Sequence, residues 1–267
     1  MSNKTKATIT DIIGRIQYRL ALAGGWIDQP FVSKHNPSCP GSMVVVAVEP
    51  QFRFMDRAGI CGSTRSIALD LWSDDLPDED PEKLVRKLYE IENKDKAEPS
   101  GSQDMIGIIY PGINRLDYDY EYEGGYFPRH IESNNDPQIA AWLESVLHII
   151  PVSTRPDGYN PLGRQNLLPE WVARLGRSGK DCFDAIVNRD IDALGKSMNE
   201  CMKCWHTLLP DIVEHPTLKV DLVSLLEFYQ ANYAGAMYSG CGGGYLYVVS
   251  EQKVPGAFQV KIKTAGK

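Results

Sequence analysis

The sequence predicts an α+β protein with two lobes, and three observations support this. The first half alternates strand-like apolar segments, such as residues 43–48, with helical patterns. The second half is mostly helical and closes with strand-like segments at 245–250 and 258–263. A loop-rich stretch at 151–168 separates the halves, so the predicted lobes are residues 1–150 and 151–267.

The elements of the first half are predicted from their patterns and end signals. A segment at 12–23, rich in strand-favouring residues, ends at a glycine pair, and Pro50 closes the strand at 43–48. A helix covers 67–72, and Asp80 and Pro81 read as the N-cap and first position of another helix. Segments 106–110 and 116–122 are predicted as strands.

The segment at 116–122 alternates strictly, which places Leu116, Tyr118, Tyr120 and Tyr122 on one face of a strand. Such a stripe of aromatic rings can stack on bases or sugars. We favour the alternative, a sheet face packed on a helix. In the second half, residues 137–150 are expected to form one helix that runs into a strand, and further helices are expected at 181–194, 194–208 and 218–234.

Composition excludes several classes of protein. The 267 residues are 43% hydrophobic and 24% charged, which is typical of a globular chain. A net charge of −7 argues against a nucleic-acid partner, because such binders gain affinity from basic surfaces. The longest apolar run is too short to span a membrane, and residues 1–6 lead into no hydrophobic signal. Six scattered cysteines suggest reduced thiols, so we expect a cytoplasmic protein.

Three glycine-rich segments are candidates for binding a ligand closely. Gly24 and Gly25 follow a strand and precede Asp28. Residues 59–64 precede a helix, where backbone N–H groups form an anion cradle, although a plain helix cap fits equally well. Residues 235–244 hold five glycines and are predicted as a loop that either a ligand or the other lobe approaches. Between them, the loop at 99–104 ends in Asp104, a candidate proton acceptor.

Taken in order, these segments resemble the GHMP kinases, in particular the branch with heptose-phosphate and fucose kinases. Arg19 and Asp28 stand nine apart, as in that branch's first motif. Residues 59–63 loosely match the family's phosphate loop, Gly-Leu-Gly-Ser-Ser. Glu92 and the segment at 101–104 match its Ile-Glu and Gly-x-Gln-Asp motifs. Residues 235–244 match its Gly-Ala-x-x-Ser-Gly-x-Gly-Gly-Gly in full.

The resemblance implies a lobe like ribosomal protein S5 domain 2 joined to a ferredoxin-like lobe. It implies ATP- and Mg²⁺-dependent phosphorylation of a hydroxyl on a sugar or sugar phosphate. Asp104 and Arg19 would be catalytic, and Ser63 and Glu92 would hold Mg²⁺. Residues expected to contact the substrate are Asp28, Gly25, Gln103 and, a little further along, His35. Residues expected to contact the nucleotide are Gly59, Cys61, Gly62, Ser63, Thr64, Gly240, Gly242, Gly243 and Gly244.

The sequence also departs from the family pattern. Cys61 stands where the family has a glycine, so its Cβ would obstruct backbone approach to phosphate, whereas Arg65 would add a phosphate contact. The segment between Asp28 and Gly59 is shorter than usual and lacks the elements that normally flank adenine. The alternative is therefore a catalytically inactive relative that binds a sugar or nucleotide. A monomer or homodimer is expected.

The pair Cys201 and Cys204, followed by His206, invites a metal-site interpretation. Zinc needs four ligands and no second cysteine pair lies nearby, while Trp205 breaks the haem-attachment pattern. Because the two cysteines lie three apart in a helical stretch, we favour buried packing.

Overall fold

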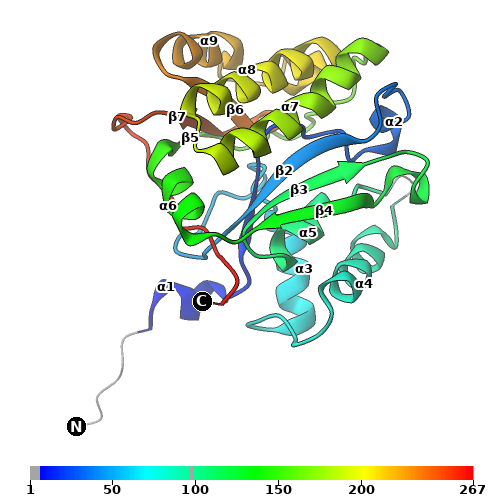
Figure 1. The fold of residues 1–267 in the computed structure, drawn as a ribbon, viewed down its shortest axis with the longest axis vertical. Coiled ribbons are helices and arrows are strands. Elements are labelled where there is room, and N and C mark those ends of the chain that lie inside the picture. The colour runs from blue at the N-terminus through cyan, green and yellow to red at the C-terminus, as the bar shows by residue number, and fades with distance from the viewer. Residues whose placement is uncertain (1–6, 97–98, 267) are drawn as a thin grey trace.

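Two antiparallel sheets organise residues 7–96 and 99–266, which are the residues that this computed structural model describes (Figure 1). The expectation drawn from residues 1–6 lies outside them. The first sheet has four strands in the order β1–β2–β3–β4, and the second has three in the order β5–β7–β6. The strands are β1 (Tyr18–Ala21), β2 (Gly41–Val48), β3 (Ile113–Tyr118), β4 (Pro128–Asn134), β5 (Leu147–Ser153), β6 (Gly235–Gly240) and β7 (Gly243–Val249). This confirms the predicted α+β class.

Helices cover both faces of the first sheet. The helices are α1 (Ile9–Ile13), α2 (Pro30–Ser33), α3 (Gly62–Trp72), α4 (Pro81–Asn93), α5 (Gln103–Ile109), α6 (Pro137–Val146), α7 (Pro169–Asn188), α8 (Ile191–Leu208) and α9 (Leu222–Asn232). Helix α7 packs on β2 from one side, and α5 packs on β1 and β2 from the other, with α3 and α4 outside it (Figure 1). Helix α8 pairs with α7 and covers β6 of the second sheet.

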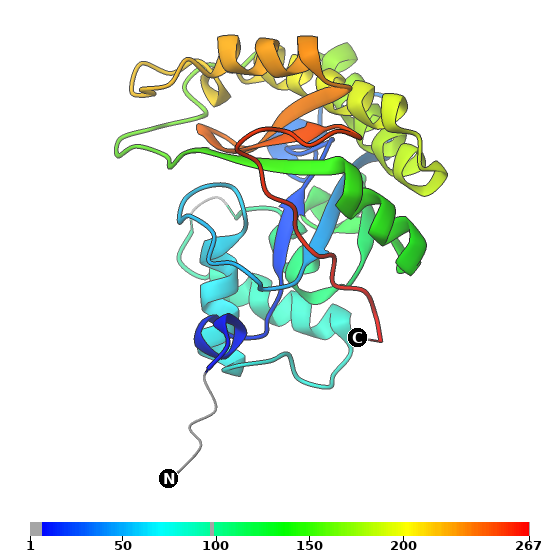
Figure 2. The ribbon, with the colours of Figure 1, turned by 90° about the vertical axis from the view of Figure 1, so that its left-hand side faces the viewer.

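The two sheets are interlocked, because elements of the second half also contact the first sheet. Besides α7, the C-terminal segment runs back from the second sheet along β2 (Figure 2). It bridges Ile149 through Phe258 and Val48 through Ile262. The second sheet begins with β5, so the predicted division after residue 150 falls inside that strand.

Glycines let α7 approach β2 at backbone distance. A Cβ atom added to Gly179 would lie 1.9 Å from the carbonyl oxygen of Ser42, and one added to Gly176 would lie 2.7 Å from the Cα atom of Gly41. Gly24, which follows β1, also lies against Ser42 and Gly179. This three-way contact fixes the turn after β1, and with it the start of the segment that leads to Asp28.

Several predicted elements differ in the structure. Residues 106–109 belong to helix α5 rather than to a strand, since a short apolar run that is buried all round has no distinguishing period. Strand β3 ends at Tyr118, because Tyr122 donates its backbone N–H to Asp119 in a turn. Tyr120 and Tyr122 are consequently exposed and extend no buried stripe.

The glycine-rich segment at 235–244 is a β-hairpin rather than a loop. Gly235–Gly240 forms β6, and a turn at 241–242 leads directly into β7. The segment at 12–23 begins in the last residues of α1 and then contains the short strand β1, and the segment at 258–263 forms isolated bridges instead of a strand. The buried packing expected for Cys201 and Cys204 is confirmed.

Substitution of Gly179 by Ala is expected to destabilise the protein strongly. The new methyl group meets backbone atoms, which cannot move aside as a flexible side chain would. We expect a loss at the upper end of the about 1–3 kcal/mol typical of overpacking, or a fall in Tm of roughly 6–12 °C. Thermal unfolding measures this. Gly62→Ala is the control, because a Cβ atom there has nothing within 4 Å; equal Tm values for the two variants would contradict the account.

Candidate active site

Two adjoining hollows lie where the two sheets meet. The first, here called the Asp28 hollow, has a volume of about 230 Å³, and the second, the Ser63 hollow, about 380 Å³. The Asp28 hollow is lined by Arg19, Ala21, Gly25, Trp26, Asp28, Gln29, Gly59, Gln103, Asp104, Arg155, Trp205, Ser239, Gly240 and Cys241. The Ser63 hollow is lined by Arg19, Asp56, Arg57, Ala58, Gly59, Cys61, Gly62, Ser63, Ser66, Asp104 and Arg155. The shared residues are Arg19, Gly59, Asp104 and Arg155, so the hollows form one continuous cleft.

An ion pair between Arg19 and Asp104 marks the junction of the hollows. Arg19 projects from β1, and Asp104 lies in the first turn of α5. The Arg19 side chain is only 6% exposed, and its Nη1 donates to the carbonyl of Gly59 (3.3 Å). Gly107 makes room for the arginine stem, since a Cβ atom there would lie 2.0 Å from its Cγ. The predicted catalytic pair is therefore brought together at one point.

Asp28 is fully buried at the back of its hollow. The turn that leads to it is closed by a bond from the N–H of Ile27 to the carbonyl of Gly24. Its Oδ2 accepts a hydrogen bond from Gln29 Nε2 (2.9 Å), whereas its Oδ1 has no partner among the described residues. Burial raises the pKa of Asp28 to about 6, against the opposing hydrogen bond from Gln29 and the charge of Arg19.

The Ser63 hollow is built around the N-terminus of α3, an eleven-residue helix. Gly62 and Ser63 are exposed there, together with Arg57. Cys61 adopts the left-handed conformation (φ 55°) that normally favours glycine. Its side chain is buried, its sulfur donates to the carbonyl of Asp104 (3.4 Å), and the residue still lines the hollow.

The β6–β7 hairpin closes the cleft from the second sheet. Ser239 Oγ donates to the carbonyl of Ala58 (2.6 Å). A Cβ atom on Gly244 would lie 2.2 Å from that same oxygen, and one on Gly59 would lie 2.7 Å from the carbonyl oxygen of Ser239. These backbone contacts between the hairpin and the loop before α3 explain much of the hairpin's glycine content. They agree with the alternative that the glycine-rich segment is approached by the other lobe.

The remaining predicted residues occupy different places. Gly240 lines the Asp28 hollow, but Gly242 faces Tyr159, Gly243 faces Leu222 and Gly244 faces Ala58. Thr64 is fully buried beneath the helix end, and its Oγ1 faces no partner among the described residues. His35, which lies after α2, lines neither hollow. None of these placements by itself tests ligand contact.

Arg65 does not add a phosphate contact, because its guanidinium is bound on the other side of α3. It donates to the backbone carbonyls of Ile13, Gly14 and Ile16 and lies 4.2 Å from the ring centroid of Tyr18. The arginine therefore ties α3 to the segment between α1 and β1. A position next to a phosphate-loop motif therefore does not fix the direction in which a long side chain points.

Trp26, Trp205 and Arg155 are among the cleft residues that lay outside the sequence predictions. Trp26 directly follows the predicted Gly24–Gly25 turn, so its position in the sequence could have identified it as a site residue. Trp205 reaches the same turn from α8, where its Nε1 donates to the carbonyl of Gly25 (3.0 Å). Arg155 lies in the loop after β5, and its Nε donates to the carbonyl of Cys241 (2.9 Å). No local pattern pointed to Trp205 or Arg155, since both depend on tertiary folding.

The Ser63 hollow suits a polyanion. Arg19, Arg57 and Arg155 line it beside Asp56 and Asp104, Arg57 pairs with Asp157 (2.6 Å), and the helix N-terminus adds N–H groups at an end without a side-chain cap. For a divalent cation, Ser63 offers an exposed hydroxyl at the hollow, whereas Glu92 is outside its lining and one of its oxygens pairs with Lys96 (3.3 Å). The other oxygen, Oε2, is buried without a partner among the described residues. In the described part of the chain, no group of three or more His, Cys, Asp or Glu side chains is arranged so that it could hold a metal ion by itself.

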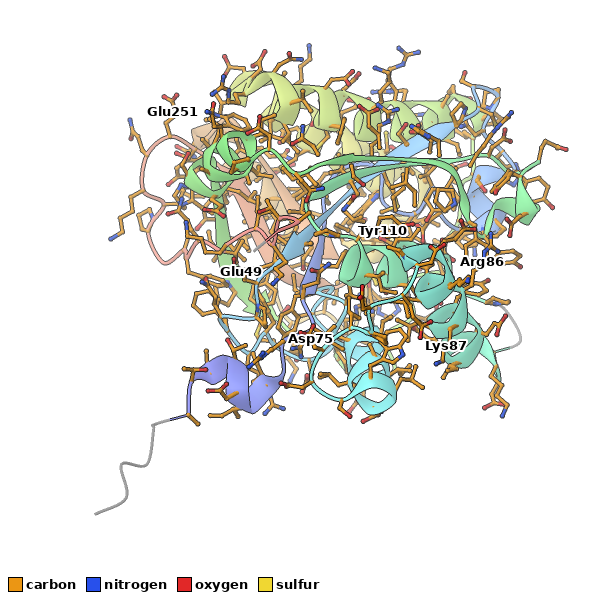
Figure 3. All side chains as sticks on the ribbon, turned by 60° about the horizontal axis from the view of Figure 1, so that its bottom comes forward. Glu49, Asp75, Arg86, Lys87, Tyr110 and Glu251 are labelled. Atoms are coloured by element: carbon orange, nitrogen blue, oxygen red, sulfur yellow. The ribbon has the colours of Figure 1, made fainter. Side chains whose placement is uncertain are left out.

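Another hollow, of about 250 Å³, lies between α4, α5 and β4. Arg86 and Tyr110 line it (Figure 3). Arg86 is already paired with Glu82 and Glu123 and stacks on Phe127, so the charge of its guanidinium is satisfied.

Among the described helices, none is long and apolar enough to cross a membrane.

Asp28→Asn is expected to stabilise the protein at high pH and not at low pH. Below the ordinary pKa of 3.8 the carboxyl is protonated in both the folded and unfolded states. Above about pH 6 it is charged in both, and the folded state bears a desolvation cost of about 3 kcal/mol. The Tm of the variant should therefore exceed that of the wild type by several degrees at pH 8 and by close to zero at pH 4.

Thermal unfolding at the two pH values checks this expectation. Asp70→Asn, which alters an exposed aspartate on α3, is the control and should show no such difference. An equal Tm shift for Asp28→Asn at pH 4 and pH 8 would contradict the assigned pKa.

Comparison with known proteins identifies the fold. No family model matches the sequence, and no curated protein matches it significantly. Solved structures do match at low identity. Mevalonate kinase from Methanococcus jannaschii has a TM-score of 0.61 and 10% identity, with 98% of this chain and 100% of that chain covered. D-glycero-D-manno-heptose 1-phosphate kinase from Bacteriodes thetaiotaomicron has a TM-score of 0.53 and 12% identity, with 93% and 96% covered.

A third match, mevalonate diphosphate decarboxylase from Staphylococcus aureus, has a TM-score of 0.52 and 12% identity, with 95% and 97% covered. The fold therefore accompanies more than one named activity. At identities of 10–12%, these structural matches establish the fold alone. The reaction has to be argued from the residues of the site. The chain has the fold of the GHMP kinases.

Proposed function

We propose that the protein is an ATP-dependent small-molecule kinase that transfers the γ-phosphoryl group to a hydroxyl of a sugar or sugar phosphate. The observation that supports this most directly is the ion pair of Arg19 and Asp104 at the junction of the two hollows. A phosphoryl donor in the Ser63 hollow and an acceptor in the Asp28 hollow would meet at this pair. The fold shared with kinases supports the same reaction class.

The donor's phosphates suit the Ser63 hollow. The end of α3 presents N–H groups, and Arg57 and Arg155 add positive charge around it. Such preorganised donors stabilise the charge of a transferring phosphoryl group without reorganising during the reaction. Mg²⁺ would neutralise further phosphate charge when bound, with Ser63 and Glu92 as its proposed ligands.

A third hollow offers room for the nucleotide base. It has a volume of about 250 Å³ and shares Asp56, Gly62 and Ser66 with the Ser63 hollow. Its walls are polar and apolar in about equal parts: the polar side chains are Arg53, Asp56, Arg65 and Ser66, and the apolar ones are Ile12, Ile13, Tyr18, Phe54, Met55, Ile60 and Leu69. Helix α1 and the end of the short segment between Asp28 and Gly59 together supply its walls. This arrangement supports nucleotide binding by a shortened lobe.

Asp104 and Arg19 have distinct proposed roles in transfer. The acceptor hydroxyl oxygen bonds to the γ-phosphorus while the bond from that phosphorus to the bridging oxygen breaks, and the hydroxyl proton passes to Asp104. Arg19 stabilises negative charge on the transferring group and positions Asp104 through their ion pair. Asp28 holds other hydroxyls of the acceptor. A cytoplasmic location and a monomeric or homodimeric state remain predictions.

The second candidate is a catalytically inactive protein that binds a sugar or nucleotide. Cys61 favours it, because a buried left-handed cysteine occupies the loop where the resembling family has glycine. The retained pair of Arg19 and Asp104 favours the kinase.

Asp104→Asn is expected to lower kcat about 10²–10⁴-fold by removing the proton acceptor. Asn has nearly the same shape and keeps an acceptor oxygen for Arg19 but loses the charge, so circular dichroism should still show the native fold below the unfolding transition while Tm falls. Binding of an ATP analogue is measured beside it. Transfer of labelled phosphate to a panel of sugars and sugar phosphates measures the effect. Asp75→Asn, which makes the same change at an exposed site after α3, is the control (Figure 3).

Undiminished turnover of Asp104→Asn would exclude the proposed role of this residue. Nucleotide binding without transfer to any acceptor, in wild type as in the variant, would favour the inactive alternative.

A further inference from the structure

Two tryptophans form the part of the Asp28 hollow that lies away from the Ser63 hollow. Trp26 and Trp205 line the Asp28 hollow and are absent from the lining of the other. They come from distant parts of the chain, the turn after β1 and helix α8. Neither was among the residues that the sequence suggested for this site. We therefore consider which surface of a bound ligand these two rings would contact.

Trp26 is the accessible ring of the two. It is partly exposed, and its backbone lies in the left-handed region (φ 80°), which bulky residues rarely occupy. A glycine would adopt this conformation at lower cost, so the chain keeps a tryptophan where the backbone disfavours one. Such local strain is typical of a side chain retained for contact with a ligand.

Trp205 lines the same hollow from helix α8. The ring is only 3% exposed and packs against Gly25, where an added Cβ atom would lie 3.0 Å from Cζ2. Its Nε1 hydrogen bond to the carbonyl of Gly25 fixes the turn that carries Trp26. Trp205 is thus a positioning residue for Trp26 and an apolar part of the hollow's lining.

Unpaired acceptors face the same hollow. Asp28 Oδ1 and Gln103 Oε1 are buried without a full hydrogen bond among the described residues, and the Gln103 side chain lies close enough to Asp28 to lower the pKa of that carboxyl as a weak donor. Buried polar atoms are normally paired, so a bound ligand is expected to donate to both. Hydroxyl groups donate, whereas ionised phosphate and carboxylate groups only accept. The hollow therefore favours a ligand with several hydroxyls.

Positive charge in the hollow is confined to its junction side. The arginines in its lining are Arg19 and Arg155, and both also line the Ser63 hollow. Arg19 is already paired with Asp104. A phosphate carried by the acceptor, remote from the reacting hydroxyl, would lie near the tryptophans and the carboxylate of Asp28, where it would be desolvated and repelled.

From these observations we infer that the acceptor is an uncharged monosaccharide rather than a sugar phosphate. The apolar C–H face of its ring lies against Trp26 beside Trp205, and its hydroxyls donate to Asp28 and Gln103. The inference rests on the proposed function for the identity of the reaction. Binding of the sugar itself requires no nucleotide, so it is tested separately from transfer.

The test is sugar binding to the full chain without nucleotide, measured by saturation-transfer difference NMR and calorimetry. The probes are glucose, galactose, mannose and fucose, each compared with its 1-phosphate, and the 6-phosphates of the three hexoses. We expect at least one neutral sugar to bind, with saturation strongest on its ring C–H protons, and its phosphates to bind at least about tenfold more weakly.

Two variants separate ligand contact from structural packing. Trp26→Gly should weaken the neutral sugar about tenfold, while Tm changes by less than about 4 °C, because the glycine relieves the left-handed backbone. Trp205→Phe should also weaken binding, since Gly25 loses its hydrogen bond. Trp171→Phe is the control: this residue lies on α7, stacks with Arg174 and lines neither hollow.

Each outcome decides the inference. Phosphorylated sugars that bind as tightly as the neutral ones would overturn it, as would sugar affinity unchanged by Trp26→Gly. Absence of all sugar binding would overturn it even if phosphoryl transfer to another acceptor is observed, and the proposed kinase would then stand. Tryptophan-dependent binding of a neutral sugar without any transfer would support it and refute the kinase.

Discussion

The buried ion pair of Arg19 and Asp104 is the constraint on which the site depends. A buried arginine needs a charge partner, and the pair joins the central part of the first sheet to the start of α5. Gly107 must lack a side chain for the arginine to pass, and the carbonyl of Gly59 accepts a hydrogen bond from Arg19 Nη1. The pair thereby ties sheet, helix and phosphate-side loop to one point, and both hollows open onto it.

Close backbone contacts hold the rest of the cleft around this point. Gly179 lets α7 lie on β2, and Gly244 lets the β6–β7 hairpin lie on the loop before α3. Both contacts join the second half of the chain to the first. The cleft consequently forms between interlocked halves, and Arg155 and Trp205 reach the first sheet's residues from the second half. Glycine content in this protein reflects such approaches at least as much as it reflects ligand binding.

Sequence patterns predicted the α+β class, the buried strand at 43–48 and the N-cap and proline that open α4, because these features depend on local chemistry. They also predicted Arg19, Asp28 and Asp104, which the structure brings into one cleft. Residues 106–109 were mistaken for a strand because a fully buried run lacks periodicity. The direction of Arg65 and the arrival of Trp205 and Arg155 follow from tertiary packing, which local patterns do not encode.

In the proposed arrangement, the Ser63 hollow and the neighbouring hollow beside α1 form a nucleotide site that faces an acceptor site across Arg19 and Asp104. Calorimetric titration of the wild-type protein with a non-hydrolysable ATP analogue and Mg²⁺ tests this most directly. The account predicts micromolar binding that weakens when Mg²⁺ is removed and that exceeds the affinity for inorganic triphosphate, which lacks a base for the neighbouring hollow. No binding heat up to millimolar analogue would contradict it.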